Sequence, residues 1–65
     1  EHVFAYSRIY EDQQWLVICN MSSEKQTFTV QHEAVRVIVS NYPLKQLPDG
    51  KVDLRPYEAF VVEVK

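Results

Sequence analysis

Short runs of β-branched and aromatic residues, separated by polar clusters, constrain the fold of this chain more than any other feature. No long segment has the 3.6-residue periodicity of an amphipathic helix. Runs at such short, regular spacing are typical of small all-β domains. The pattern predicts a small antiparallel β-sandwich, Greek-key-like, with about six strands. The expected strands are Val3–Tyr10, Trp15–Met21, Gln26–Val30, Val35–Ser40, Lys51–Leu54 and Ala59–Val64.

Three connecting segments carry specific expectations. Asp49-Gly50 is a tight-turn signal and predicts a hairpin turn leading into the fifth strand. Gln31–Ala34 is compatible with a short helical turn. The segment 55–58 (Arg-Pro-Tyr-Glu) predicts a rigid corner before the last strand, because proline donates no backbone hydrogen bond and forces the preceding residue into an extended conformation.

The length of 65 residues allows a single domain, residues 1–65, which buries only about 60 % of its unfolded surface. Apolar residues make up 46 % of the chain, so it is expected to fold rather than to remain disordered. The sequence begins at Glu1 without methionine and enters a strand-like run within two residues. These features predict a piece of a longer protein.

Charge and cysteine content limit the partners. The net charge of −2 comes from scattered residues without a basic cluster, which argues against nucleic acid. The apolar run from Trp15 to Ser23 is too short for a bilayer, which needs about 20 residues, and nothing resembles a signal peptide. Cys19 is the only cysteine, in agreement with a reducing, cytoplasmic compartment, and its place within a strand predicts burial.

No set of titratable residues converges in the pattern expected of a catalytic centre. Glu11 and Asp12 are neighbours in a turn, and His2 and His32 lie thirty residues apart without a partner at metal-ligand spacing. Asp49 and Asp53 offer too few oxygens for calcium, which takes six to eight. We therefore expect no catalytic, cofactor-binding or metal-binding residue.

Asn20-Met21-Ser22 matches the N-glycosylation pattern, which arises often by chance. Because Asn20 stands at the end of an expected strand, its side chain is predicted to bond backbone groups there instead.

The aromatic residues allow two interpretations. They could form a flat platform on which sugars stack, or they could supply the core and a covered face of a small domain. The second interpretation is favoured because no cluster of exposed polar groups accompanies them. The residues concerned are Tyr6, Tyr10, Trp15, Tyr42 and Tyr57.

Four segments occur here in one order: "VFAYSRIY", "WLVICNMSSE", "VSNYP" and "DLRPYEAFVVEV". This series resembles the C-terminal β domain of α-amylase-type glycoside hydrolases, in the group of oligo-1,6-glucosidases, dextran glucosidases and trehalose-6-phosphate hydrolases. The resemblance extends from Val3 to Val64, and residues 20–24 and 54–59 are its most specific parts. Phe60 departs from the family pattern, which is more polar at that place.

The resemblance implies an enzyme that hydrolyses α-glucosidic bonds by a retaining mechanism, with its catalytic carboxylates in a (β/α)₈ barrel that precedes this domain. None of the catalytic motifs of that barrel matches a position here. The chain is therefore expected to be noncatalytic and to stabilise and shield the barrel. A carbohydrate-binding module and a dimerisation domain are the alternatives.

The last strand and the corner before it supply the expected contact surface. The strand is apolar on both faces, so we expect one face and a free edge to meet the barrel or, in a homodimer, a second copy. Tyr57 would cover an edge with its ring. The expected interdomain or self-association residues are Arg55, Tyr57, Phe60 and Val62.

Overall fold

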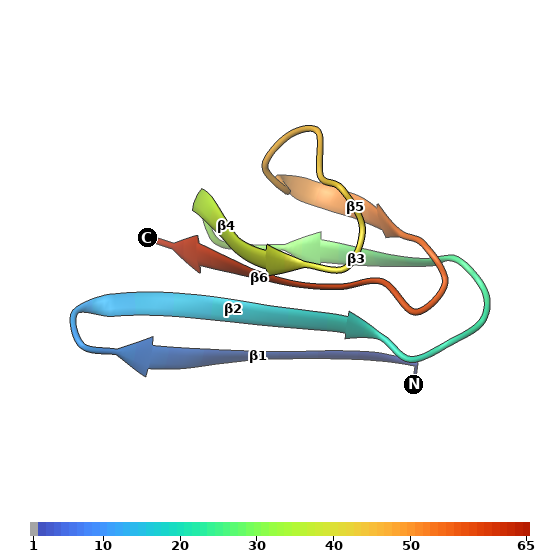
Figure 1. The fold of residues 1–65 in the computed structure, drawn as a ribbon, viewed down its shortest axis with the longest axis horizontal. Helices are drawn as coiled ribbons and strands as arrows, with labels where there is room; N and C mark the ends of the chain where they lie inside the picture. The colour runs from blue at the N-terminus through green and yellow to red at the C-terminus, as the bar shows by residue number, and fades with distance from the viewer. Residues whose placement is uncertain (1) are drawn as a thin grey trace.

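The computed structural model describes residues 2–65, which form six β-strands and contain no helix. The all-β class is thereby confirmed. The helical turn expected at Gln31–Ala34 is wrong, because Ala34 already begins a strand and the backbone N–H of Lys65 donates to the Glu33 carbonyl at 3.0 Å. The strands are β1 (Val3–Tyr10), β2 (Gln13–Asn20), β3 (Gln26–Val30), β4 (Ala34–Ser40), β5 (Gly50–Leu54) and β6 (Ala59–Val64) (Figure 1).

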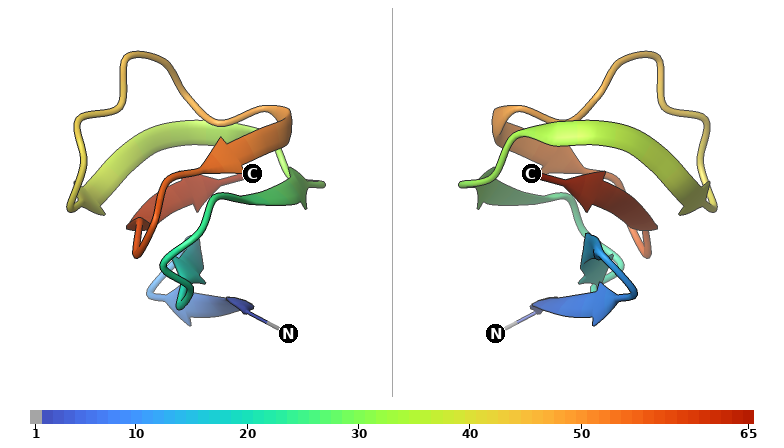
Figure 2. Two further views of the ribbon diagram at one scale, coloured as in Figure 1. Left: turned by 90° about the vertical axis from the view of Figure 1, so that its right-hand side faces the viewer. Right: turned by 90° about the vertical axis from the view of Figure 1, so that its left-hand side faces the viewer.

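The strands form two antiparallel sheets. The larger sheet has the order β1-β2-β6-β4, and the smaller sheet consists of β3 and β5. Figures 1 and 2 show β3 and β5 lying behind one face of the larger sheet. The last strand, β6, pairs with β2 on one side and with β4 on the other. It is a central strand, so the expectation of a free edge along it is wrong.

The segment 41–49 is a crossover between the sheets and not a hairpin. It leaves β4 in the larger sheet and enters β5, which pairs with β3. Gly50 has a φ of 62°, the left-handed conformation that its turn signal indicates. Gly50 is nevertheless the first residue of β5, and the expected hairpin pairing of the flanking strands is wrong because each finds its partner elsewhere.

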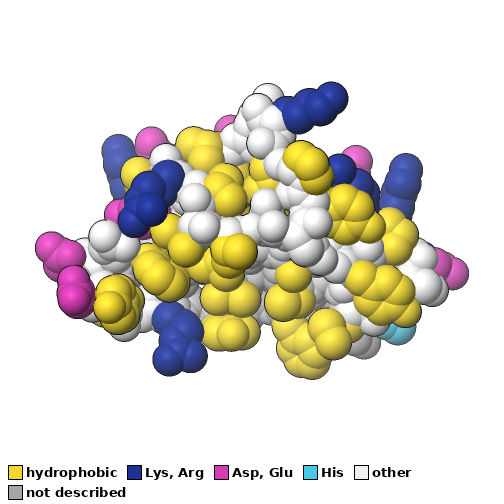
Figure 3. Space-filling view, in the orientation of Figure 1, with side chains coloured by type: hydrophobic (Ala, Val, Ile, Leu, Met, Phe, Trp, Pro, Cys, Tyr) yellow, Lys and Arg dark blue, Asp and Glu magenta, His cyan; other side chains and the backbone are white. Residues whose placement is uncertain are grey.

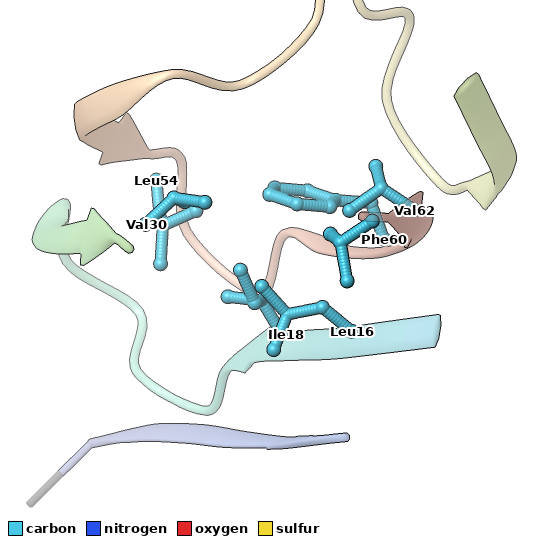
Figure 4. Packing of buried hydrophobic residues seen from close by; sticks show 7 residues of the cluster. Leu16, Ile18, Val30, Leu54, Phe60 and Val62 are labelled. Atoms are coloured by element: carbon cyan, nitrogen blue, oxygen red, sulfur yellow. The ribbon is translucent and has the colours of Figure 1, made fainter. Parts of the chain in front are cut away.

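The hydrophobic core lies between the two sheets. Phe60 and Val62 of β6 stand opposite Ile18 and Leu16 of β2 in the sheet register. Figure 4 shows these side chains converging with those of the smaller sheet. Phe60 is 3 % exposed and Val62 is 0 % exposed, so these two residues do not belong to a contact surface as expected. The buried cluster is Leu16, Ile18, Val30, Leu54, Phe60, Val62 and Val64.

The opposite face of the larger sheet is also rich in apolar side chains. In register, Phe4 stands beside Cys19 and Tyr6 beside Val17, and Val17 in turn stands beside Val61. Hydrophobic side chains are spread over the part of the molecule that β1 and β2 occupy (Figure 3). Cys19 is only half-buried, contrary to expectation, because it lies on this face, outside the core between the sheets.

Candidate functional site

Residues 55–58, the corner, carry the chain from β5 in one sheet to β6 in the other. The backbone N–H of Glu58 donates to the Arg55 carbonyl at 3.0 Å and closes a turn. Tyr57 adopts a φ of 56°, which a non-glycine residue rarely does. The backbone N–H of Tyr57 also donates to the Ser22 carbonyl at 3.0 Å, which ties the turn to the loop after β2. The rigid corner predicted from Pro56 is confirmed.

Glu58 is the charged centre of the corner and is 2 % exposed. Its Oε1 accepts from the backbone N–H of Arg55 at 2.7 Å, and its Oε2 accepts from Arg55 Nη2 at 3.0 Å. Burial alone would raise the pKa of Glu58, but these hydrogen bonds outweigh it and hold the pKa below its ordinary value. The hydrogen bond to Glu58 likewise raises the pKa of Arg55. Both groups stay ionised and neutralise each other.

Arg55 also holds the loop that follows β4. Its guanidinium lies 4.2 Å from the centre of the Tyr42 ring, a cation–π contact, and its Nη2 donates to the Pro43 carbonyl at 3.1 Å. The Tyr42 hydroxyl donates to the Pro56 carbonyl at 2.9 Å. A side chain of each segment therefore donates a hydrogen bond to a backbone carbonyl of the other segment.

Two asparagines complete the corner by bonding backbone groups. Asn20 Nδ2 donates to the carbonyls of Glu24 and Arg55 at 2.9 and 3.0 Å. Asn41 Nδ2 donates to the Tyr57 carbonyl at 2.8 Å, and its Oδ1 accepts from the Ala59 N–H at 2.8 Å. The predicted role of Asn20 is confirmed, and its 2 % exposure leaves no room for a glycan in this fold.

The structural roles of Glu58 and Asn41 were missed at the level of sequence. The signals that point to them are the Arg-x-x-Glu spacing around Pro56, which suits a turn closed by an ion pair, and an asparagine directly after the strand that ends at Ser40.

Glu58→Gln is expected to destabilise the domain by about 1–2 kcal/mol at neutral pH, because the amide makes weaker hydrogen bonds to Arg55. It also removes the pH-dependent contribution of the Glu58 charge to stability. Because the folded-state pKa of Glu58 is lowered, its charge stabilises the fold above the unfolded-state pKa. That stabilisation is lost as pH falls through the folded-state pKa. Thermal denaturation between neutral and acidic pH should show the midpoints of Glu58→Gln and of the unmodified protein converging as the pH falls.

The control is Glu24→Gln, at an exposed glutamate whose side chain lies outside this ion pair. It should follow the unmodified protein at every pH. If the difference in thermal midpoint between Glu58→Gln and the unmodified protein stays constant down to acidic pH, the assigned role of the Glu58 charge is contradicted.

Residues 3–61 match the profile of the family described as the Alpha-amylase SusG C-terminal domain. The chain belongs to this family. The resemblance noted from the four sequence segments is thereby confirmed.

Two curated relatives of this family member are glucosidases. The Glucan 1,6-alpha-glucosidase of Streptococcus pneumoniae is 38 % identical over 64 residues, which cover 98 % of this chain and 12 % of the relative. The Oligo-1,6-glucosidase of Bacillus cereus is 34 % identical over 67 residues, which cover 97 % of this chain and 12 % of the relative. The chain thus spans about an eighth of the length of these relatives.

Solved structures show the same fold in other enzymes. The isomaltulose synthase of Erwinia rhapontici superposes with a TM-score of 0.83 at 22 % identity, over 98 % of this chain and 12 % of that one. The trehalulose synthase MutB of Pseudomonas mesoacidophila gives a TM-score of 0.82, also at 22 % identity and with the same coverage. At this level of identity the similarity concerns the fold of the domain.

The expected contact residues separate into two groups. Arg55 and Tyr57 lie in the corner, where Tyr57 is 59 % exposed. Phe60 and Val62 lie in the core. Contact of the corner with a barrel or with a second copy stays a prediction, whereas contact through the side chains of Phe60 and Val62 is wrong.

The aromatic residues considered for sugar stacking do not form one platform. Tyr10 and Trp15 lie together at the β1–β2 turn, with ring centres 5.5 Å apart and planes inclined by 41°. Tyr57 lies in the corner, and Tyr42 contacts the corner from the loop after β4, at the other end of β2. A single flat platform built from all five is therefore wrong.

The described part of the chain, residues 2–65, offers little for chemistry. It contains no group of three or more histidine, cysteine, aspartate or glutamate side chains placed to hold a metal ion. A hollow lies between the 43–49 loop and β5, lined by Leu44, Leu54 and Phe60 beside the paired Arg55 and Glu58. None of the described segments is a helix long and apolar enough to cross a membrane.

Proposed function

We propose that this chain is the noncatalytic C-terminal β-sandwich domain of a cytoplasmic α-glucosidase-type glycoside hydrolase, where it stabilises and shields a (β/α)₈ catalytic barrel. The observation that carries the proposal is the family match together with the 12 % of each glucosidase relative that the chain spans. The cytoplasmic location is supported by the single, unpaired Cys19.

The acidic residues of this domain support a noncatalytic role. Retaining hydrolysis of a glycosidic bond uses two carboxyl groups about 5 Å apart on either side of the bond. Among the acids within residues 2–65, only Glu58 and Glu63 are not exposed, and they are paired with Arg55 and Arg36. Acids engaged in this way hold the fold together, and the hydrolytic carboxylates belong to the rest of the enzyme.

Deleting this domain from the full-length enzyme is expected to lower the thermal midpoint of the remaining barrel by several degrees, since a covered surface becomes exposed. Turnover of p-nitrophenyl α-glucoside per folded molecule should persist at low temperature. The measurement is thermal inactivation of both forms.

Unchanged thermal stability would contradict a stabilising role. Unchanged stability combined with weaker binding of isomaltose would favour the carbohydrate-binding alternative, for which the Tyr10–Trp15 pair is the candidate surface.

A further inference from the structure

Strand β1 is covered far less than the other strands of its sheet. Its residues from Phe4 to Tyr10 are all exposed, and only Val3 is partly buried. Apolar side chains stand on both faces, because Tyr6 is 52 % exposed on the outer face and Ile9 is 74 % exposed on the face turned toward the core. The two-stranded sheet covers β2 and β6 but does not reach Ile9.

The free edge of β1 presents a regular row of unpaired backbone groups. The His2 carbonyl accepts from the Met21 N–H at 2.7 Å, so these two residues form a hydrogen-bonded pair. Such pairs alternate along an antiparallel ladder, which places Phe4, Tyr6, Arg8 and Tyr10 in bonds with β2. The backbone groups of the alternate residues, Val3, Ala5, Ser7 and Ile9, point to the free edge.

The other edge of the same sheet is protected. Strand β4 has register irregularities between Ala34 and Arg36 and between Val37 and Val39, which interrupt the ladder. Strand β1 pairs in uninterrupted register over its whole length. It contains no proline, and Arg8 is its one charged residue. Sheet edges of folded proteins rarely remain so long, regular and apolar without a cover.

We propose that β1 is an interior strand of the complete enzyme: a strand from the rest of the same polypeptide pairs with its free edge, and apolar side chains of that polypeptide cover Phe4 and Tyr6. This inference rests on the proposed function, since the occupant is the part of the enzyme that lies outside this domain. The relatives supply ample chain for it, because this domain spans only 12 % of their length.

A second copy of the domain fits the exposure of β1 less well. Two copies pairing through β1 about a two-fold axis would satisfy the edge groups and extend the sheet. The outer face with Phe4 and Tyr6, and the inner face with Ile9, would remain open to water. An occupant that covers the edge and both faces must approach from several sides, as a larger domain of the same chain does.

Amide hydrogen exchange of the full-length enzyme tests the pairing directly. Segment Val3–Tyr10 has eight backbone N–H groups, of which those of Phe4, Tyr6, Arg8 and Tyr10 are bonded to β2 and serve as internal controls. If the edge is paired, Val3, Ala5, Ser7 and Ile9 should lose their fast exchange and match their neighbours. Fast exchange at these alternate positions would overturn the proposal.

Tyr6→Lys in the full-length enzyme tests the covered face. It should lower the midpoint of the domain's thermal transition by about 4–8 °C, whereas the control Leu47→Lys, at an exposed apolar side chain of the crossover 41–49, should leave it near that of the unmodified enzyme. Equal midpoints for the two variants would contradict the proposal that Tyr6 is covered. If the enzyme is dimeric and Tyr6→Lys converts it to monomers, the cover of β1 is a second copy and the proposed occupant is wrong.

The domain deletion described above separates the two proposals. If deletion destabilises the barrel but β1 exchanges as a free edge, the proposed function stands and the role of β1 is wrong. If deletion has no effect on the barrel, the proposed function itself fails.

Discussion

Replacing Phe60 with lysine is expected to unfold this domain. Phe60 is 3 % exposed and stands opposite Ile18, in a core that Leu54 closes from the other sheet. Loss of a buried phenylalanine side chain costs about 3–5 kcal/mol. An unpaired ammonium group in the same place costs several kcal/mol more. A domain of this size has about 3–10 kcal/mol in total, so the variant should lose its β-sheet circular dichroism and show no cooperative urea transition.

Tyr57→Lys is the matched control for this experiment. It makes the same change from aromatic to cation three residues earlier, at a side chain that is 59 % exposed. Its urea midpoint should stay close to that of the unmodified protein, because the new ammonium remains in water. Equal midpoints for the two variants would show that Phe60 does not lie in the core.

The position of Phe60 illustrates where prediction from the sequence ended. The strand Ala59–Val64 was predicted from its β-branched composition and the proline before it. Which of its two faces turns toward the core could not be predicted, because Phe60, Val62 and Val64 alternate with residues that are almost as apolar. The register with β2 decides it, and that register depends on residues about forty positions away in the chain.

The corner shows the same division between local and distant interactions. Pro56 and the end of the second strand are local signals, so the turn and the backbone-bonding role of Asn20 were predictable. The contacts of Asn41 with Tyr57 and Ala59 join segments 16 and 18 residues apart. They exist only once β4 lies beside β6, which local patterns do not specify.

Strand β1 is a third case, in which the alternation of the sequence and the burial of the side chains differ. Alternation in Val3–Tyr10 predicted a strand, and a strand is present. Its residues from Phe4 to Tyr10 are nevertheless exposed, and only Val3 at its start packs against the core. Under the pairing that we propose for β1, these apolar residues contact protein that lies outside this domain.

Asn20→Ala is expected to destabilise the domain by about 2–4 kcal/mol, since it leaves three backbone groups without their partner. These are the carbonyls of Glu24 and Arg55 and the N–H of Ser22, which donates to Asn20 Oδ1 at 2.9 Å. Asn20 is 2 % exposed, so water cannot easily replace the lost bonds. Urea denaturation at neutral pH measures the loss.

Asn20→Asp separates the hydrogen-bonding role of this side chain from its volume. The carboxylate keeps an acceptor for Ser22 but directs its second oxygen at the carbonyls of Glu24 and Arg55, where the amide donated. Burial and these carbonyls should raise the folded-state pKa of the new acid above its unfolded value of about 3.9. The folded state then binds more protons than the unfolded state, so stability should fall as pH rises from about 4 to 7, opposite in sign to the Glu58 effect. Asn20→Ala should lack this added slope, and an Asn20→Asp variant as stable as the unmodified protein at neutral pH would contradict the donor role of Asn20.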